Sequence, residues 1–322
     1  MAVPAGTIQS YNEPIATGGN REDLSDVLFD VSPTETPFLT AIGKNTATAT
    51  NHEWLTDALA DPVENAAVEG DDAAGVTPSS RVRLNNYTQI LTKEAIVSGT
   101  QEKVLKGGGI KSEMAYQVAR RMKEIKRDLE QACVGTPHIK EAGSDTTPRF
   151  LGSLETYLSG TSYQGGVGAA SPTGNGVNLG TPGTPRPFDE AILIAALAQL
   201  WDQSGGNENV LGLAGSFNRG IVSTFTASST RYVSTDDAKL QASIDVYDGD
   251  FHTVTMTPDR YTAPDSVFII DPEFAKLSDQ RPMFSQDLAV TGDSTKKQVI
   301  WETTLEVCNP LAIMQIAGLT VA

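Results

Sequence analysis

Few residues of this 322-residue chain have the types and spacing that catalysis or metal binding requires. The segment His52–Thr56 begins like the His-Glu-x-x-His helix of zinc proteases, in which two histidines one helical turn apart hold the metal. Thr56 occupies the second histidine position, so the motif is incomplete. His52, His138 and His252 share no ligand spacing, and the two cysteines lie far apart. The sequence therefore predicts no zinc site.

Three other motifs also fail when their chemistry is considered. Residues 109–112 resemble the end of a phosphate-binding loop but lack its glycine spacing. Gly215 and Ser216 lack the flanking glycines of a nucleophile elbow. Asp71 and Asp72 are adjacent, so their carboxylates diverge and a solvated acidic turn is the better interpretation. We therefore expect neither an enzyme nor a bound cofactor or metal.

The composition narrows the class of protein further. The chain has 24 basic and 40 acidic side chains, for a net charge of −16. This balance argues against a dedicated nucleic-acid binder or a basic membrane-surface module, because both depend on Lys and Arg. The longest apolar run, 191–198, is too short to span a bilayer, and the N-terminus lacks the pattern of a signal peptide. Cys133 and Cys308 are expected to be buried free thiols of a protein made in a reducing cytosol.

Two segments near the N-terminus are predicted to bury too little apolar surface to be stable on their own. Residues 1–45 form an arm, because Pro33 and Pro37 interrupt any continuous helix. Residues 46–98 are predicted to form two long strands, one from position 46 to 56 and the return from 81 to 98, joined by an acidic tip. Because such segments bury little apolar surface alone, we expect both to require an external partner.

The clearest helix is predicted over 112–135. Ser112 is a suitable N-cap, and apolar residues spaced three and four apart form one stripe: Ala115, Val118, Met122, Ile125, Leu129 and Ala132. The opposite face is basic and includes Arg120, Arg121 and Lys123. Residues 1–75 contain 13 acidic and 2 basic side chains, whereas residues 102–135 contain 8 basic and 5 acidic ones. These opposite charges predict self-complementary contacts, within a chain or between copies.

The second half of the chain has the periodicity of a layered α/β unit. Residues 136–187 are predicted as long surface loops with a short apolar island at 150–158. Helices are expected over 188–201, buried on all sides, and 217–225. Strands are expected at 210–214, around 254–256 and at 267–270. A closing hairpin is predicted over 297–322, with its turn at Asn309-Pro310.

At this point the sequence resembles the major capsid proteins of tailed phages, which have the Hong Kong 97-type shell fold. The resemblance rests on motifs that occur in the same order along most of the chain. They are Asp23–Phe38, Ala49–Trp54 followed by Thr56-Asp57, Ala66–Gly70, Pro258–Tyr261, Arg281-Pro282 and Leu288–Asp293.

The resemblance implies an α+β fold with four parts. Residues 1–45 would be the N-terminal arm and 46–98 an extended β-hairpin loop. Residues 99–135 and 276–322 would form a peripheral domain around a long spine helix, and 136–275 an α/β axial domain. The shell position of the 136–187 insertion stays open. Lysine–asparagine cross-linking, which some relatives perform, has no matching positions here and is not carried over.

The function implied is a self-assembling head shell in the virion, made in the host cytoplasm and enclosing double-stranded DNA without sequence-specific binding. Its partners would be copies of itself in pentamers and hexamers and the portal, with scaffolding or decoration proteins left open, and no membrane. The alternatives are a nanocompartment shell protein and, from another class, a carbohydrate-binding surface protein.

Specific inter-subunit contacts are also expected. The loop acids Glu64, Glu69, Asp71 and Asp72 are predicted to dock near Arg120, Arg121 or Lys123 of a neighbouring copy. Trp54 would be the apolar anchor at that contact, unless it covers its own hairpin. Arg281, in the matching Arg281-Pro282 pair, is also assigned to an inter-subunit contact.

Overall fold

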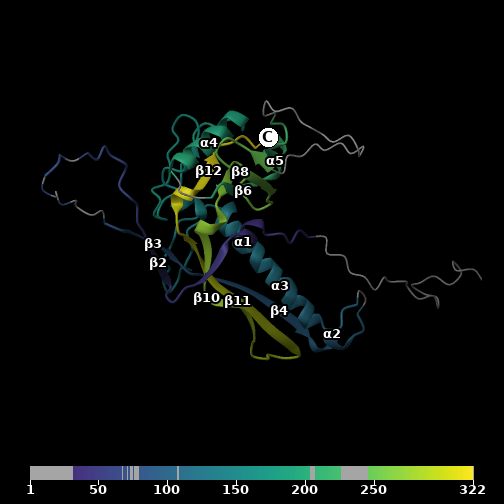
Figure 1. Cartoon of the computed structure of the whole chain (residues 1–322). Helices are drawn as coiled ribbons and strands as arrows, with labels where there is room; N and C mark the ends of the chain where they lie inside the picture. Colours follow the sequence, from purple (N-terminus) through teal and green to yellow (C-terminus); the bar gives the residue numbers. More distant parts are fainter. Residues whose placement is uncertain are drawn as a thin grey trace, which may run out of the picture.

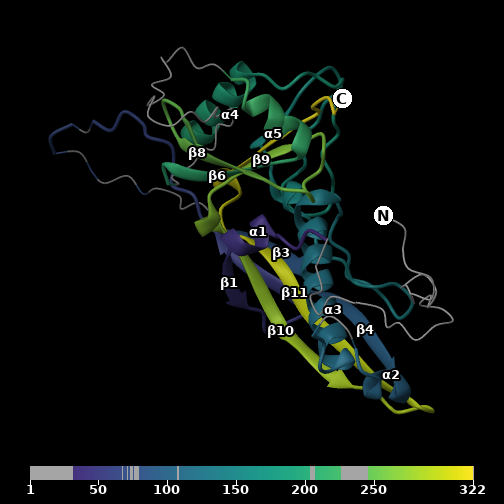
Figure 2. The same ribbon diagram turned by 90° about the vertical axis from the view of Figure 1, so that its right-hand side faces the viewer.

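A computed structural model of the chain describes residues 32–66, 68–70, 72, 75, 80–106, 109–203, 207–225 and 246–321. The predictions for residues 1–31 of the arm and for Asp71 of the loop concern residues outside these ranges. The described residues form a compact unit around a six-stranded sheet, and an elongated unit made of a four-stranded sheet and one long helix (Figures 1 and 2). A thin two-stranded hairpin leaves the body where the two units meet (Figure 1).

The elongated unit is built on a four-stranded sheet whose first pair is parallel and whose other pairs are antiparallel. Two long central strands carry most of it, and their pairing is shifted near Pro282, which lacks the N–H that a regular ladder would use. In sheet order the strands are β1 (Gly43–Thr46), β10 (Ala275–Asp287), β11 (Ser294–Val307) and β4 (Gln89–Ser98).

One long helix, α3 (Glu113–Glu130), packs along this sheet (Figure 2). The Ser112 hydroxyl accepts from the backbone N–H of Ala115, which confirms the predicted N-cap. The helix continues into a π-helical turn, Gln131–Gly135, so the predicted bounds hold. The buried stripe runs through Met114, Ile125 and Leu129, whereas Ala115 is exposed, contrary to the prediction. The short helix α2 (Gly99–Lys103) lies at the other end of α3.

The compact unit contains a mixed six-stranded sheet. Its strands are, in sheet order, β5 (Ser162–Gln164), β12 (Ile313–Ala317), β9 (Val267–Ile270), β6 (Asn209–Ala214), β8 (Thr253–Pro258) and β7 (Val246–Asp248). The helices α4 (Glu190–Gln203) and α5 (Ser216–Val222) share one apolar core with this sheet. The predicted elements between 188 and 270 are confirmed. The expectation that α4 is buried on all sides is wrong, because Ile194 and Trp201 are 44% and 56% exposed.

The predicted closing hairpin is wrong. After β11 the chain passes through a short 3-10 turn, Pro310–Ala312, and β12 then enters the other sheet, where it pairs with β9 and β5. The strand β11 pairs with β10 and β4 instead. Both sides of Asn309-Pro310 are apolar, and each strand is buried more completely in its own sheet than a two-stranded ribbon would allow. The chain therefore ties the two units together at this turn.

The predicted long two-stranded excursion is also divided. Only β2 (Asn51–Thr56) and β3 (Val82–Tyr87) pair with each other, over six positions. The return strand breaks at Thr88, and β4 then joins β11 over ten positions. Residues 57–66, which follow β2, are exposed and extend away from both units (Figure 1). The part of the chain that projects from the body is therefore shorter than 46–98.

Two further segments lie over the junction. The helix α1 (Pro37–Ala41) contacts α3, with Phe38 fully buried. The predicted apolar island is buried around a 3-10 turn, Leu154–Tyr157, and a second such turn, Pro272–Phe274, precedes β10. Most of 136–187 otherwise lacks helix and strand, as predicted.

Candidate functional site

The segment that follows β2 presents side chains that its own chain does not cover. Leu59 is 98% exposed and Val63 is 78% exposed. Glu64, Glu69 and Asp72 are exposed beyond them. Single exposed apolar side chains are common on soluble proteins, so the feature to explain is that apolar and acidic side chains occur together on one projecting segment.

Trp54, at the base of the same hairpin, packs inside its own chain. Its indole Nε1 donates a hydrogen bond of 2.8 Å to the carbonyl oxygen of Val307, and its ring lies 5.9 Å from that of Tyr157. With only 9% of its surface exposed, Trp54 has almost no area left for a neighbour. In the single chain Trp54 thus covers its own hairpin and fixes it to the body, which is the alternative interpretation, and a role at an inter-subunit contact stays a prediction.

A buried carboxylate completes this attachment. Glu306 on β11 accepts hydrogen bonds from Asn45 Nδ2 at 3.0 Å and Ser278 Oγ at 2.8 Å, and it lies 3.1 Å from His52 Nε2. Bonding to His52 is the main reason that the pKa of Glu306 falls to about 2. The network joins β1, β2, β10 and β11 in one place, so the direction of the hairpin is determined by polar contacts as well as by packing.

A second buried carboxylate, Glu302, lies on β11 four residues before Glu306, on the same face of the strand. Its oxygens accept from Arg149 at 2.5 Å, Arg281 at 2.6 Å and the Thr88 hydroxyl at 3.1 Å. Arg281, expected at an inter-subunit contact, thus pairs within its own chain, although 44% of its side chain stays exposed. The Arg149–Glu302 pair links the 136–187 insertion to the four-stranded sheet.

The basic side chains of α3 are partly paired on the helix itself. Glu124 receives Arg121 Nη1 at 2.6 Å and lies 3.5 Å from Arg120 Nε. Lys123 is exposed. Residues 57–66, which lead toward the acidic side chains, extend away from α3 in both views (Figures 1 and 2).

Glu130, which the sequence did not single out, is fully buried at the end of α3. Its two oxygens accept from the backbone N–H groups of Phe38 at 2.7 Å and Leu39 at 2.9 Å. The one sign of Glu130 in the sequence was its position, because it directly follows Leu129 of the apolar stripe on the predicted helix. The partner, 91 or more positions earlier in the chain, could not be read from that signal.

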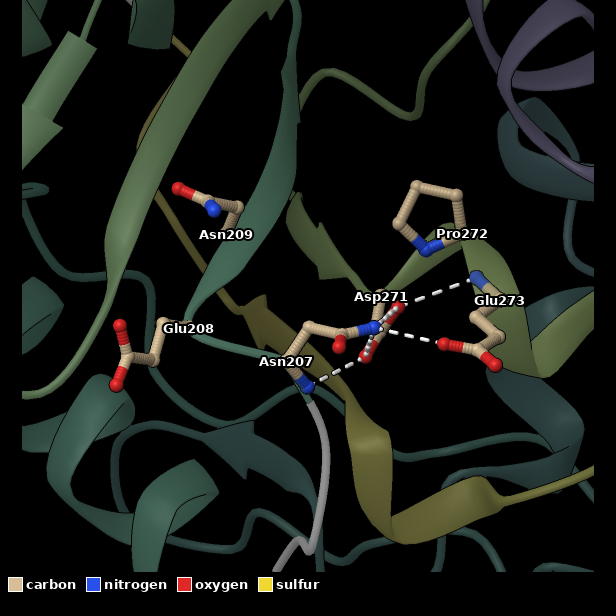
Figure 3. A pocket seen from close by; sticks show the side chains of 6 residues that line it. All are labelled: Asn207, Glu208, Asn209, Asp271, Pro272 and Glu273. Carbon is tan, nitrogen blue, oxygen red and sulfur yellow. Dashed lines mark hydrogen bonds between the residues drawn. The ribbon is translucent and has the colours of Figure 1, made fainter.

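A hollow of about 550 Å³ lies beside β6 (Figure 3). One of its carboxyl groups, Asp271, accepts from the backbone N–H groups of Asn207 at 2.9 Å and Glu273 at 3.1 Å (Figure 3). Across the described ranges, no group of three or more His, Cys, Asp or Glu is arranged to hold a metal ion. The described lining of the hollow thus contains backbone caps around Asp271.

The cysteines and the helices bear on two further expectations. Cys133 is buried and Cys308 is half-buried, and both are free thiols. Within the ranges that the structure describes, every helix is too short or too polar to cross a membrane.

The fold is similar to that of solved capsid subunits. It is similar to a subunit of the Cyanophage A-1(L) capsid asymmetric unit, with a TM-score of 0.70 and 12% identity, covering 97% of this chain and 100% of that one. It is also similar to the capsid of a native GTA particle, with a TM-score of 0.61 and 15% identity, covering 94% and 96% of the two chains. The mixed α+β fold is thus that of phage capsid proteins.

The chain belongs to the SU10 major capsid protein family, whose model matches residues 6–320. This is a family of structural proteins and not a class of enzymes. The major capsid protein of Escherichia phage Phieco32 is 30% identical over 214 residues, which are 57% of this chain and 60% of that protein. The chain thus spans less than two thirds of the length of this curated relative.

Proposed function

We propose that this protein is the major capsid protein of a phage head, many copies of which assemble into an icosahedral shell that encloses double-stranded DNA. Family membership over residues 6–320 supports this role. The observation that carries it is the projecting loop, whose apolar side chains lie in solvent in the single chain. A protein that assembles through heterologous contacts has such unsatisfied surface until its neighbours are present.

The proposal assigns a role to each part of the chain. Residues 1–45 are the N-terminal arm, and the projecting part of 46–98 is the extended loop. The four-stranded sheet with α3 is the peripheral domain, and the six-stranded sheet with α4 and α5 is the axial domain. In this assignment β4 belongs to the peripheral domain and β12 to the axial domain, because each strand pairs there.

The loop is proposed to dock on the peripheral domain of a neighbouring copy. Glu64, Glu69, Asp71 and Asp72 would lie near Arg120, Arg121 or Lys123 of that copy, and Leu59 and Val63 would supply apolar contact. Opposite charges give such a contact its register, and the buried apolar side chains contribute about 1.5–3 kcal/mol each. Arg120 and Arg121 already share Glu124, so the neighbour's acids would extend an existing ionic cluster.

The shell would be a container and not a DNA-binding protein. A net charge of −16 repels phosphate, so packaged DNA would be held without strong or sequence-specific contacts. The portal is a further expected partner. Whether scaffolding or decoration proteins also bind is left open and is tested on a complete head. Synthesis in the host cytoplasm followed by incorporation into the virion completes this proposal.

Particle size tests the proposed function directly. The purified chain is expected to yield rings or closed particles in sizing chromatography and electron microscopy, because each subunit contacts several others. A protein that stays monomeric under every assembly condition tried, with residues 57–66 protected from protease, would contradict the proposal.

Charge reversal tests the docking contact. Glu64→Lys with Glu69→Lys should reduce particle yield at least tenfold, and Arg120→Glu with Lys123→Glu should do the same. Combining the two pairs should restore part of the yield, because each new cation again faces an acid. Asp202→Lys, an exposed change on α4, is the matched control and should leave assembly intact. Failure of the combined variant to recover any particles, with each pair disruptive alone, would place the loop elsewhere.

A further inference from the structure

A buried side chain at the end of α3 binds the start of the described chain. Glu130 is completely buried, and its carboxylate accepts the N–H groups of Phe38 and Leu39 at 2.7 and 2.9 Å. These are the first-turn donors of α1, which no preceding residue caps. The carboxylate therefore substitutes for the missing N-cap of a helix that is distant in sequence.

Few contacts besides Glu130 hold α1 itself. Of its five residues Phe38 is buried, and Ile42, which ends the helix, is buried in the same core. Just before the helix, Tyr261 Oη lies 3.4 Å from the carbonyl oxygen of Pro33, which is the long end of a hydrogen bond. A five-residue helix is not stable in isolation. Its position thus depends on these apolar contacts, on the strand β1 that follows it and pairs with β10, and on the Glu130 carboxyl group at its first turn.

The surroundings of Glu130 favour its neutral form. The helix α1 contributes no ionisable side chain, and the chain segment after β8 contributes Asp259, a second carboxyl group that is 2% exposed. On its own helix, Arg127 stacks over the ring of Tyr261, Asp128 pairs with Lys93, and Cys133 is a buried neighbour in the π-helical turn. Burial, and to a smaller extent Asp259, raise the pKa of Glu130 to about 7, against the opposing effect of the two backbone donors.

We propose that Glu130 is a proton-dependent clasp that sets whether α1 is docked, and thereby where the N-terminal arm leaves the subunit. The inference rests on the proposed function only in that the arm of a shell subunit contacts its neighbours. When α1 is docked, water cannot reach the carboxylate. When α1 leaves, water solvates the carboxylate, whose ionised form then becomes the stable one near neutral pH.

The direction of the pH effect follows from this difference. The docked state holds a proton on Glu130 up to about pH 7, and the undocked state loses it near 4.5. Docking thus takes up a proton between these values, so it is strongest in acid and weakens as pH rises through 7. The docking constant should fall about tenfold from pH 6 to pH 8.

Hydrogen exchange of the full chain tests the clasp. Amides 38–42 should lose about tenfold protection between pH 6 and pH 8, after correction for intrinsic exchange rates. In Glu130→Gln, which has a similar shape and no titrating group, protection should be independent of pH. Glu124→Gln, a surface carboxyl on the same helix, should behave like the unmodified chain. Constant protection in the unmodified chain, or a persisting pH effect in Glu130→Gln, would overturn the proposal.

A second variant covers the case in which Glu130→Gln does not fold. Asp259→Asn removes the neighbouring carboxyl group, so the midpoint of the pH dependence should move to lower pH, and an unmoved midpoint would overturn the clasp. The readout is obtained on unassembled chain as well as on particles. If the chain never forms particles while the exchange profile is as expected, the proposed function fails and the clasp stands.

Discussion

Trp54 and Val307 are joined by a hydrogen bond of 2.8 Å from the indole Nε1 to the backbone carbonyl oxygen, 253 positions apart in the sequence. Both residues are buried, and the bond crosses from the hairpin to the last residue of β11. The loop proposed to reach a neighbouring subunit is therefore held by its own subunit at its base. A rigid base lets a projecting loop present its side chains in one direction.

Replacing Trp54 should release this base. Trp54→Phe keeps an aromatic ring but leaves the Val307 carbonyl without its donor, at a cost of about 1–3 kcal/mol in the free energy of unfolding. Trp54→Ala also opens a cavity and should cost about 3–5 kcal/mol. Urea unfolding followed by circular dichroism measures both. Leu55→Ala, at the 58% exposed neighbouring position, should change stability by less than about 0.5 kcal/mol.

Glu306 should make stability dependent on acid. Its pKa falls to about 2 in the folded chain, chiefly through His52, so the folded state holds the ionised form. This contribution is present above the ordinary pKa of about 4.5 and is lost as pH falls through 2. Glu306→Gln should show a smaller loss of urea midpoint between pH 5 and pH 2.5 than the unmodified chain. Glu53→Gln, on the exposed side of the hairpin, should leave that loss unchanged; equal losses in all three proteins would contradict the prediction.

Gly135 should not tolerate a side chain. A Cβ at this position would lie 2.0 Å from the backbone carbonyl oxygen of Tyr261, which cannot move aside as a flexible side chain can. Gly135→Ala should therefore lower the free energy of unfolding by about 2 kcal/mol or more. Gly220→Ala, within α5, meets nothing within 4 Å and should be neutral or stabilising by about 0.5–1 kcal/mol. A Gly135→Ala protein with an unchanged thermal midpoint would show that the π-helical turn adapts.

Glu302 should matter more than either arginine that it binds. Loss of Arg281 leaves Glu302 with Arg149 and Thr88, whereas loss of Glu302 leaves two cations without their shared partner. Glu302→Ala is thus expected to destabilise the chain by about 2–4 kcal/mol, and Arg281→Ala by about 1 kcal/mol because that side chain is half exposed. Adding Arg281→Ala to Glu302→Ala should cost almost nothing further. Additive losses in the double-mutant cycle would mean that the two side chains act independently.

Local features of the chain were predictable from its sequence. The N-cap at Ser112 and the apolar spacing of α3 involve residues a few positions apart, and so do the alternation in β8 and the continuous apolar run of β9. The family resemblance added the fold class, which the capsid structures of similar fold bear out. The proposed contacts of the loop acids and of the α3 cations remain predictions, because they concern a second copy of the chain.

Pairing and burial at long range were not predictable in this way. A period of two in β11 indicates one buried face, yet Glu302 and Glu306 on the other face are buried as well. Their partners come from the hairpin, from β10 and from the 136–187 insertion, and nothing within the strand specifies those positions. The predicted closing hairpin was wrong for the same reason.

The sequence by itself determined the cap and apolar face of α3, the approximate positions of α4, β6, α5, β8 and β9, and the acidic character of the loop after β2. The tertiary structure alone decided which strand joins which sheet, and that three carboxylates, Glu130, Glu302 and Glu306, lie in the interior as joints between distant segments. Caps and periodicity act between residues a few positions apart and are therefore legible in the chain. A buried carboxyl group is stable only where separate segments bring it partners, and that convergence exists only in three dimensions.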